Sequence, residues 1–345
     1  MRLIHTARLA LLAAAVTAAP LAGQRAERFT ITGSSAVVHN LAGEVAVAAG
    51  SGSAVVVEVT RGGADAARLR VAQDGNAVRV AFPGDRVVYE RMGPRARSTI
   101  SVRQDGSLGG GLRSRRVTVA GAGNGTRAWA DVRVLVPAGR TVQVHQGVGR
   151  VQVTNVNGRL EVHTASATVR TQGTRGGLEV EVGSGTVEVR DAQGDVSLGT
   201  GSGTVTVAGV RSEGEVLVET GSGAVTATDI RARELTIDVG SGRVQASGIS
   251  ARELSVETGS GAVDLALVAD AQNVTIETGS GGVTLTVPPS FGAEVLVSTS
   301  SGGITVDVPV TRRQTERNSF RGRIGDGNGR VEIETGSGGV RIRRP

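Results

Sequence analysis

The sequence predicts an all-β protein, a parallel β-helix or β-solenoid of about ten turns, from three observations. A Gly-Ser-Gly motif returns every 18–20 residues through the second half of the 345-residue chain. Apolar and polar residues alternate on both sides of each motif, which is the pattern of half-buried strands. Aromatic residues make up only 2% of the chain and glycine contributes 52 residues, so valine, which favours strands, has to fill the core.

The repeat is a five-residue motif that usually reads acidic residue, threonine, glycine, serine, glycine. The copies are residues 181–185, 199–203, 219–223, 238–242, 257–261, 277–281 and 334–338. A variant occupies Ser298–Gly302, and two degenerate copies, His145–Gly149 and His163–Ala167, precede the regular ones. Glycine reaches positive φ without steric cost, so we expect each copy to be a sharp corner between two strands. A fixed period of this length indicates one structural unit copied along an axis.

The strands beside each corner present inward columns of branched aliphatic residues. Leu254 and Val256 precede one corner, and Val263 and Leu265 follow it. A third apolar position recurs at the far turn of each unit, with the occupants Val210, Ile230, Ile249, Val268 and Phe291. No unit can bury its own face, but stacked units bury one another's. A row of antiparallel hairpins is the alternative; the helix is favoured because linkers such as Arg231–Glu234 lack turn signals.

The first 23 residues are typical of a secretory signal peptide. Arg2 and Arg8 flank a short positive region, the apolar run Leu9–Ala22 follows, and cleavage fits near Ala22 or Gly23. This run is short for a membrane span, and no other apolar stretch approaches the required length. The sequence therefore predicts an exported protein, in the periplasm or at the cell surface or secreted, with no transmembrane segment after signal removal.

The rest of the chain divides into an irregular region and a regular one. The predicted organisation is an irregular N-terminal β region at 24–141 with an Arg/Gly-rich insertion at about 83–127, then a regular β-solenoid at 142–345 with a closing segment at 309–345. Within the insertion we expect two strands, Thr99–Arg103 and Arg116–Val119, joined by mobile loops.

Composition excludes several classes of function. The chain has no cysteine and no lysine, which removes disulfides, thiol catalysis, Schiff-base chemistry and the P-loop lysine. The corner serines recur in every unit without a repeating histidine, so they do not indicate a hydrolase nucleophile. Arginine-rich stretches at 86–116 and 312–344 lack the aromatic platforms or recognition helix of a nucleic-acid reader. We therefore expect no enzyme, no cofactor and no nucleic-acid partner.

One outward column is a candidate ligand-binding site. It consists of the residue two places before the first corner glycine in each repeat. Its occupants, in sequence order, are His145, His163, Glu181, Gly199, Glu219, Asp238, Glu257, Glu277, Ser298 and Glu334. The four consecutive carboxylates from Glu219 to Glu277 would lie about one strand spacing apart and repel by about 1 kcal/mol per solvated pair. We interpret them as a solvated acidic stripe balanced by Arg233 or Arg252. Calcium bound along Glu219, Asp238, Glu257 and Glu277 is the alternative, and a melting temperature that neither calcium nor EDTA moves would rule it out.

The two histidines of this column are 18 residues apart, so they could stack on adjacent turns as a metal-binding pair. Glu181 would be the only ready additional ligand. Because we expect no third histidine beside them, we interpret His145 and His163 as surface residues.

The run Val132–Pro137, the Gly-Ser-Gly copies and the closing segments Thr299–Val306, Phe320–Gly327 and Val331–Ile342 together resemble a known family. It is the bacterial adhesin-like β-strand-repeat family named domain of unknown function 4097. The resemblance covers roughly residues 30–345 and is strongest after Val132. It implies a β-helical fold, an extracytoplasmic location and no known reaction, and it carries no catalytic residues over to this chain.

These observations predict a non-catalytic extracytoplasmic β-solenoid that acts as an adhesion or interaction surface at the bacterial cell envelope. The expected partner is an envelope component, a surface glycan or a protein. Two alternatives stay open, a purely structural envelope scaffold and a carbohydrate-active β-helix enzyme. The enzyme would require a singular carboxylate cluster, whereas the carboxylates here repeat along the array.

Overall fold

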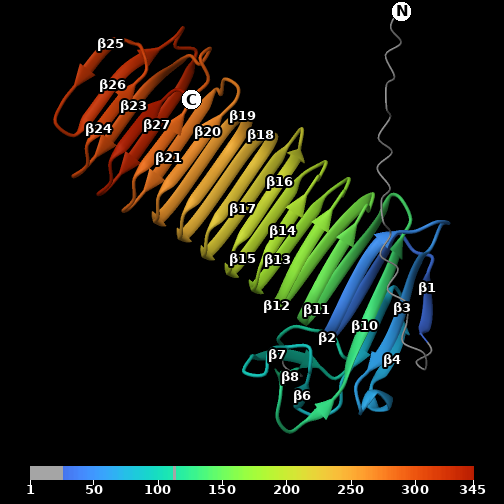
Figure 1. Cartoon of the computed structure of the whole chain (residues 1–345). Coiled ribbons are helices and arrows are strands. Elements are labelled where there is room, and N and C mark those ends of the chain that lie inside the picture. Colours follow the sequence, from blue (N-terminus) through green and yellow to red (C-terminus); the bar gives the residue numbers. More distant parts are fainter. Residues whose placement is uncertain (1–25, 112–113) are drawn as a thin grey trace, which may run out of the picture.

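The computed structural model describes residues 26–111 and 114–345 as one long stack of strands with a small sheet beside its N-terminal end (Figure 1). The protein is all-β, and a single 3₁₀ turn, η1 (Ala66–Arg68), is the only helical element among the described residues. No helix in these two ranges is long and apolar enough to cross a membrane. The predicted signal peptide, residues 1–23, lies outside the described residues.

Each coil of the solenoid consists of one arm before the corner and one arm after it. Where the backbone stays extended, a single strand runs through the corner or through the far turn. The strands of the regular coils are β11 (Arg140–Thr154), β12 (Gly158–Gln172), β13 (Leu178–Ser184), β14 (Val187–Arg190), β15 (Val196–Ser202), β16 (Val205–Arg211), β17 (Glu215–Ser222), β18 (Val225–Ser241), β19 (Val244–Ser260), β20 (Val263–Leu267), β21 (Asn273–Thr278) and β22 (Val283–Thr286).

Neighbouring coils pair in parallel and in register. The first arm of β12 pairs with β13 and its second arm with β14, and both pairings are parallel. Corner serines fall opposite one another, so that Ser184 pairs with Ser202 and Ser202 with Ser222. This pairing decides between the two predicted arrangements, because a row of hairpins would have paired the arms antiparallel. The structure is therefore a β-solenoid.

The C-terminal end departs from sequence order. Its strands are β23 (Ala293–Thr299), β24 (Ile304–Asp307), β25 (Val310–Thr315), β26 (Ser319–Ile324), β27 (Gly329–Thr335) and β28 (Val340–Arg343). The last coil in sequence, β27 with β28, lies between the coil of β21 and β22 and the coil of β23 and β24. β26 then pairs antiparallel with β23, and β25 pairs antiparallel with β26. The closing segment therefore returns into the stack instead of extending it.

The N-terminal end also contains a coil of the same stack. Its strands are β1 (Glu27–Ile31), β2 (Ser35–Ala49), β3 (Val55–Gly62), β4 (Arg70–Asp74), β5 (Ala77–Ala81) and β10 (Trp129–Val136). β2 pairs in parallel with β11 along almost its whole length, although about ninety residues separate the two strands. β10 and β5 each pair in parallel with part of β2, and β3 pairs antiparallel with β10.

The insertion forms a separate four-stranded sheet in the order β7-β8-β6-β9. Its strands are β6 (Arg86–Val88), β7 (Arg97–Arg103), β8 (Ser114–Ala120) and β9 (Thr126–Arg127). The two strands expected at Thr99–Arg103 and Arg116–Val119 are confirmed as parts of β7 and β8. β6 and β9 were not expected, because a two- or three-residue strand is too short to show alternation.

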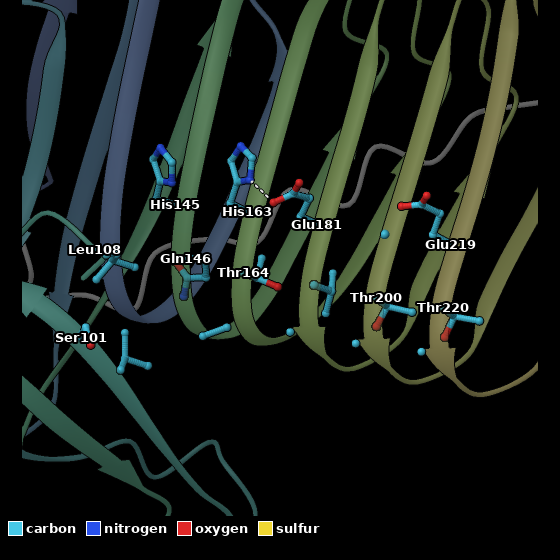
Figure 2. Close-up of a pocket in the computed structure, with 18 of the residues that line it drawn as sticks. Ser101, Leu108, His145, Gln146, His163, Thr164, Glu181, Thr200, Glu219 and Thr220 are labelled. Carbon is cyan, nitrogen blue, oxygen red and sulfur yellow. Dashed lines mark hydrogen bonds and ion pairs between the residues drawn. The ribbon is translucent and has the colours of Figure 1, made fainter. Parts of the chain in front are cut away.

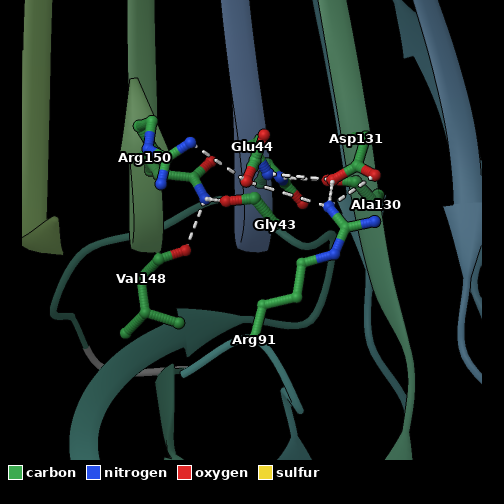
Figure 3. Close-up of polar contacts among 9 residues, drawn as sticks. Gly43, Glu44, Arg91, Ala130, Asp131, Val148 and Arg150 are labelled. Carbon is green, nitrogen blue, oxygen red and sulfur yellow. Dashed lines mark hydrogen bonds and ion pairs between the residues drawn. The ribbon is translucent and has the colours of Figure 1, made fainter. Parts of the chain in front are cut away.

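Charged contacts join the insertion to β2 and β10 at the N-terminal end of the stack (Figure 3). Arg91 Nη1 lies 3.0 Å from the Asp131 carboxylate on β10 and 3.9 Å from Glu44 on β2. Glu44 also pairs with Arg150 at 3.6 Å, and its backbone N–H donates to Asp131 at 3.0 Å. Burial raises the pKa of the Asp131 carboxyl above its ordinary value, and the Arg91 charge opposes that rise. The insertion therefore has a defined position beside one end of the solenoid.

The interior is filled by inward columns of valine, leucine and isoleucine, as the alternation predicts. One predicted column member is wrong. Val268 is 57% exposed, whereas Leu267 is buried and pairs with Ile249. The preceding coil contains an extra left-handed residue, Gly248 (φ +70°), and the pairing register shifts by one residue there. The later coil has no such residue, so its inward position falls one residue earlier.

The corner glycines set how closely the coils approach. Gly203 and Gly223 have φ of +144° and +140°, a conformation that residues with a side chain rarely adopt. A Cβ at Gly223 would also lie well inside contact distance of the Gly203 carbonyl oxygen. At these two corners the last glycine of the motif is therefore required both by its own backbone conformation and by the neighbouring coil. Gly261, Gly281 and Gly338 have no φ in this range and are required by the neighbouring coil alone.

We expect Gly223→Ala to lower the free energy of unfolding by at least roughly 1–3 kcal/mol, the cost of forcing an ordinary residue into a rare conformation. Gly199→Ala is the matched control, because its φ is not positive and an added Cβ meets only Glu181 Cγ at 4.0 Å. Urea unfolding of the two variants measures the difference. Equal unfolding midpoints would contradict the role assigned to the corner.

Candidate functional site

The outward column predicted from the repeat is continuous along the solenoid, and we call it the ladder. In the order of the stack its members are His39, His145, His163, Glu181, Gly199, Glu219, Asp238, Glu257, Glu277, Glu334 and Ser298. The order differs from the sequence at the C-terminal end, because Glu334 pairs with both Glu277 and Ser298. Imidazoles therefore occupy one end of the ladder and carboxylates most of the rest.

The expectation that no third histidine lies beside His145 and His163 is wrong. His39 on β2 stacks on His145 with ring centroids 4.5 Å apart, and His145 stacks on His163 at 5.1 Å. The three described histidines of the chain thus form one stack. Sequence reasoning missed His39 because its corner, His39–Gly43, lies about a hundred residues before the next copy and so falls outside the 18–20-residue period. A usable signal existed, since His39 precedes Gly43 by the same four residues that separate His145 from Gly149.

Two of the three imidazoles are shifted toward the neutral form. Burial, followed by the charge of the neighbouring histidine, lowers the pKa of both His39 and His145 to about 4. His39 is only 8% exposed, because the loop after β7 covers it. The Leu108 backbone N–H of that loop lies 3.4 Å from His39 Nδ1, which accepts this long hydrogen bond in its unprotonated form. The charges of Arg79 and Arg103 also lower the pKa of His39, and the charge of Asp105 raises it.

The third imidazole meets the first carboxylate of the ladder. His163 Nδ1 lies 2.9 Å from Glu181 Oε2 (Figure 2). Glu161 and Glu179 form the next outward column on the same two coils, where they are registered with each other. Arg159 Nε donates to Glu161 at 2.8 Å, and this hydrogen bond lowers the pKa of the Glu161 carboxyl. Arg159 also lies 3.6 Å from Glu179.

A groove of about 930 Å³ runs beside the ladder, between the ladder side chains and the corners. Residues of β7 and its loop, Ile100 and Leu108 among them, line the histidine end. Figure 2 shows His145, His163, Glu181 and Glu219 in one row, with Thr200 and Thr220 nearer the corners. Because Gly199 has no side chain, it leaves a gap in the row between Glu181 and Glu219. A second hollow of about 550 Å³ continues along the same face beside Glu257, Glu277 and Glu334.

The four carboxylates predicted to adjoin one another do so. Glu219 pairs with Asp238, Asp238 with Glu257, and Glu257 with Glu277. All four are exposed. The expected balance by Arg233 or Arg252 is wrong for the part of the chain that the structure describes, since neither arginine forms an ion pair with these carboxylates there. The stripe therefore faces solvent as unpaired negative charge.

The fold and the ladder define a β-solenoid that carries a charged outward row beside a shallow groove. The family described as Toastrack, domain of unknown function 4097, matches residues 171–343, which is half of the chain. The chain belongs to this family, as the sequence motifs predicted. No curated protein matches the chain.

One solved structure resembles the chain over 93% of its length and over 100% of the other chain, at 10% identity and a TM-score of 0.21. It is the crystal structure of a candidate cell adhesion protein from Clostridium sporogenes. A score this low carries no argument about the fold or the function of this chain.

Acid should destabilise the protein through the buried histidines. Their folded pKa of about 4 lies below the ordinary 6.5, so between these values the unfolded chain binds protons that the folded chain does not. Stability from this source is complete above pH 6.5 and is lost as the pH falls toward 4. Urea midpoints at pH 7 and pH 5 should therefore differ less in the double variant His39→Gln/His145→Gln than in the wild type. An unchanged difference would contradict the neutral stack.

Proposed function

We propose that the protein is a non-catalytic interaction surface of the bacterial cell envelope, with adhesion as its role and the ladder groove as its binding face. The single observation that carries the proposal is the continuous register of the ladder. It places unpaired carboxylates at a constant spacing along one face, beside the groove at Glu219 and Asp238 and the second hollow at Glu257 and Glu277. With about ten coils at roughly 4.8 Å each, this face would be near 50 Å long.

A repeating row of charge suits a ligand that is itself extended and repeating. Exposed charge pairs contribute little individually, about 0.2–1 kcal/mol each, so affinity from such a row has to come from many contacts in register. The negative sign favours a partner that presents basic groups, such as a surface protein or an amino-bearing glycan. The gap at Gly199 would admit a group projecting from that partner.

The absence of catalysis belongs to the same proposal. Retaining and inverting glycosidases use one pair of carboxylates placed on either side of the scissile bond. Here similar carboxylates recur in successive coils, and no tryptophan, tyrosine or phenylalanine lines the groove at the described residues. A binding row is therefore favoured over an active site.

The proposed location rests on the first 23 residues, which carry the pattern of a secretory signal. We expect protease added to intact cells to digest the protein, and an internal cytoplasmic protein to survive as the control. Digestion only after the outer envelope is opened would contradict adhesion. It would favour the alternative of a structural envelope scaffold.

The binding face can be tested by removing three charges from it. We expect Glu219→Gln/Asp238→Asn/Glu257→Gln to weaken binding to host or bacterial surfaces about tenfold, since three contacts of about 0.5 kcal/mol total about 1.5 kcal/mol. The measurement is attachment of the labelled full chain to whole cells.

The matched control is Glu215→Gln/Glu234→Gln/Glu253→Gln. These residues lie on the same coils, are registered with one another and carry the same charge, but they line neither of the two hollows beside the ladder. Equal attachment by both triple variants would contradict the proposed face.

A further inference from the structure

We propose that His163, Glu179 and Glu181 form a binding site for a divalent transition-metal ion of the zinc type. The site lies on β12 and β13, at the step of the ladder where imidazoles give way to carboxylates. It would exist whether or not the groove binds a partner, so it goes beyond the proposed function.

The three side chains already lie close to a metal-binding arrangement. One ligand atom from each lies within 4.8 Å of the other two. His163 Nδ1 and Glu181 Oε2 are 2.9 Å apart. Ligand atoms around tetrahedral zinc are about 3.4 Å apart, given bonds of about 2.1 Å. Closing the site therefore requires only a small rotation of the glutamate side chains, and a water molecule would complete four ligands.

The backbone beneath the site is regular parallel sheet. His163 is registered with Glu181, and Glu161 with Glu179, in the parallel pairing of β12 and β13. The His163 ring also stacks on His145 at 5.1 Å with an interplanar angle of 12°, which restricts its orientation. Ligands held on regular strands by neighbouring groups make more precise sites than ligands on loops.

The local charge suits a divalent cation. Glu161, Glu179 and Glu181 are three carboxylates, and Arg159 is the only guanidinium within ion-pair distance of them among the described residues. With the imidazole neutral, as metal ligation requires, these charges sum to minus two. Arg159 binds Glu161 more closely, at 2.8 Å, than Glu179, at 3.6 Å. The Glu179 carboxylate can therefore rotate to bind a metal ion while Arg159 remains paired with Glu161.

The imidazole selects the class of metal. Calcium and magnesium prefer oxygen ligands alone, whereas a mixed set of nitrogen and carboxylate oxygen suits zinc and its neighbours. The purely acidic part of the ladder, from Glu219 to Glu334, offers no nitrogen ligand. The described chain thus has one step of the ladder with zinc-type ligands, and it adjoins the histidine end of the groove.

Isothermal titration with Zn²⁺ tests the site on the full chain, purified without a polyhistidine tag and treated with chelator. We expect one zinc ion per chain, binding at least tenfold more weakly in His163→Gln and in Glu181→Gln, because each removes a direct ligand. Glu257→Gln is the matched control. It removes a carboxylate from the same ladder, with only carboxylates beside it, and should leave zinc binding unchanged.

Ring signals of isotope-labelled histidine provide a second readout that a folding defect would not mimic. Zinc should shift the His163 signals at a one-to-one ratio in the wild type. Loss of zinc binding in Glu257→Gln but not in His163→Gln would overturn the proposal, since the ion would then sit on the acidic stripe. Absence of any zinc-dependent heat or shift in the wild type would overturn it equally.

Discussion

The close approach of successive corner glycines is the constraint on which the rest of the structure depends. At Gly203 and Gly223 the backbone is left-handed, and the space that a Cβ would need is filled by the carbonyl of the preceding corner. At these two corners only glycine satisfies both conditions, so each of them has one place where it can pack against the preceding corner. That contact fixes the register of both arms, and the register fixes which side chains stand above one another.

Because register is fixed at the corner, the ladder gathers residues that sequence distance would keep apart. His39 lies beside His145 although the whole insertion separates them in sequence. Glu334 lies between Glu277 and Ser298. The result is a face whose chemistry changes along its length, from stacked imidazoles beside the insertion to unpaired carboxylates. Burial under the insertion keeps His39 and His145 neutral, whereas the distal carboxylates face water.

Much of this could be predicted from the sequence, because a regular period and regular alternation specify both the coil and the direction of each side chain. The column from His145 to Glu277 followed from that rule alone. The order of the last coils could not be predicted from the sequence. Val331 and Ile333 on β27 alternate with polar residues as Val295 and Val297 on β23 do, so either strand could have paired with β21. His39 was missed because the insertion separates its corner from the next copy, which breaks the period. In that corner buried Asn40 donates to the Ala130 carbonyl at 2.8 Å.

Nuclear Overhauser contacts between the histidine rings test the central claim, that one register runs unbroken through the ladder. In deuterated protein with labelled histidine, single His→Gln variants assign each ring. The structure predicts contacts from His39 to His145 and from His145 to His163, at ring separations of 4.5 and 5.1 Å, and none from His39 to His163. Absence of the contact between His39 and His145 would show that β2 does not continue the stack, and the account of the ladder would fail.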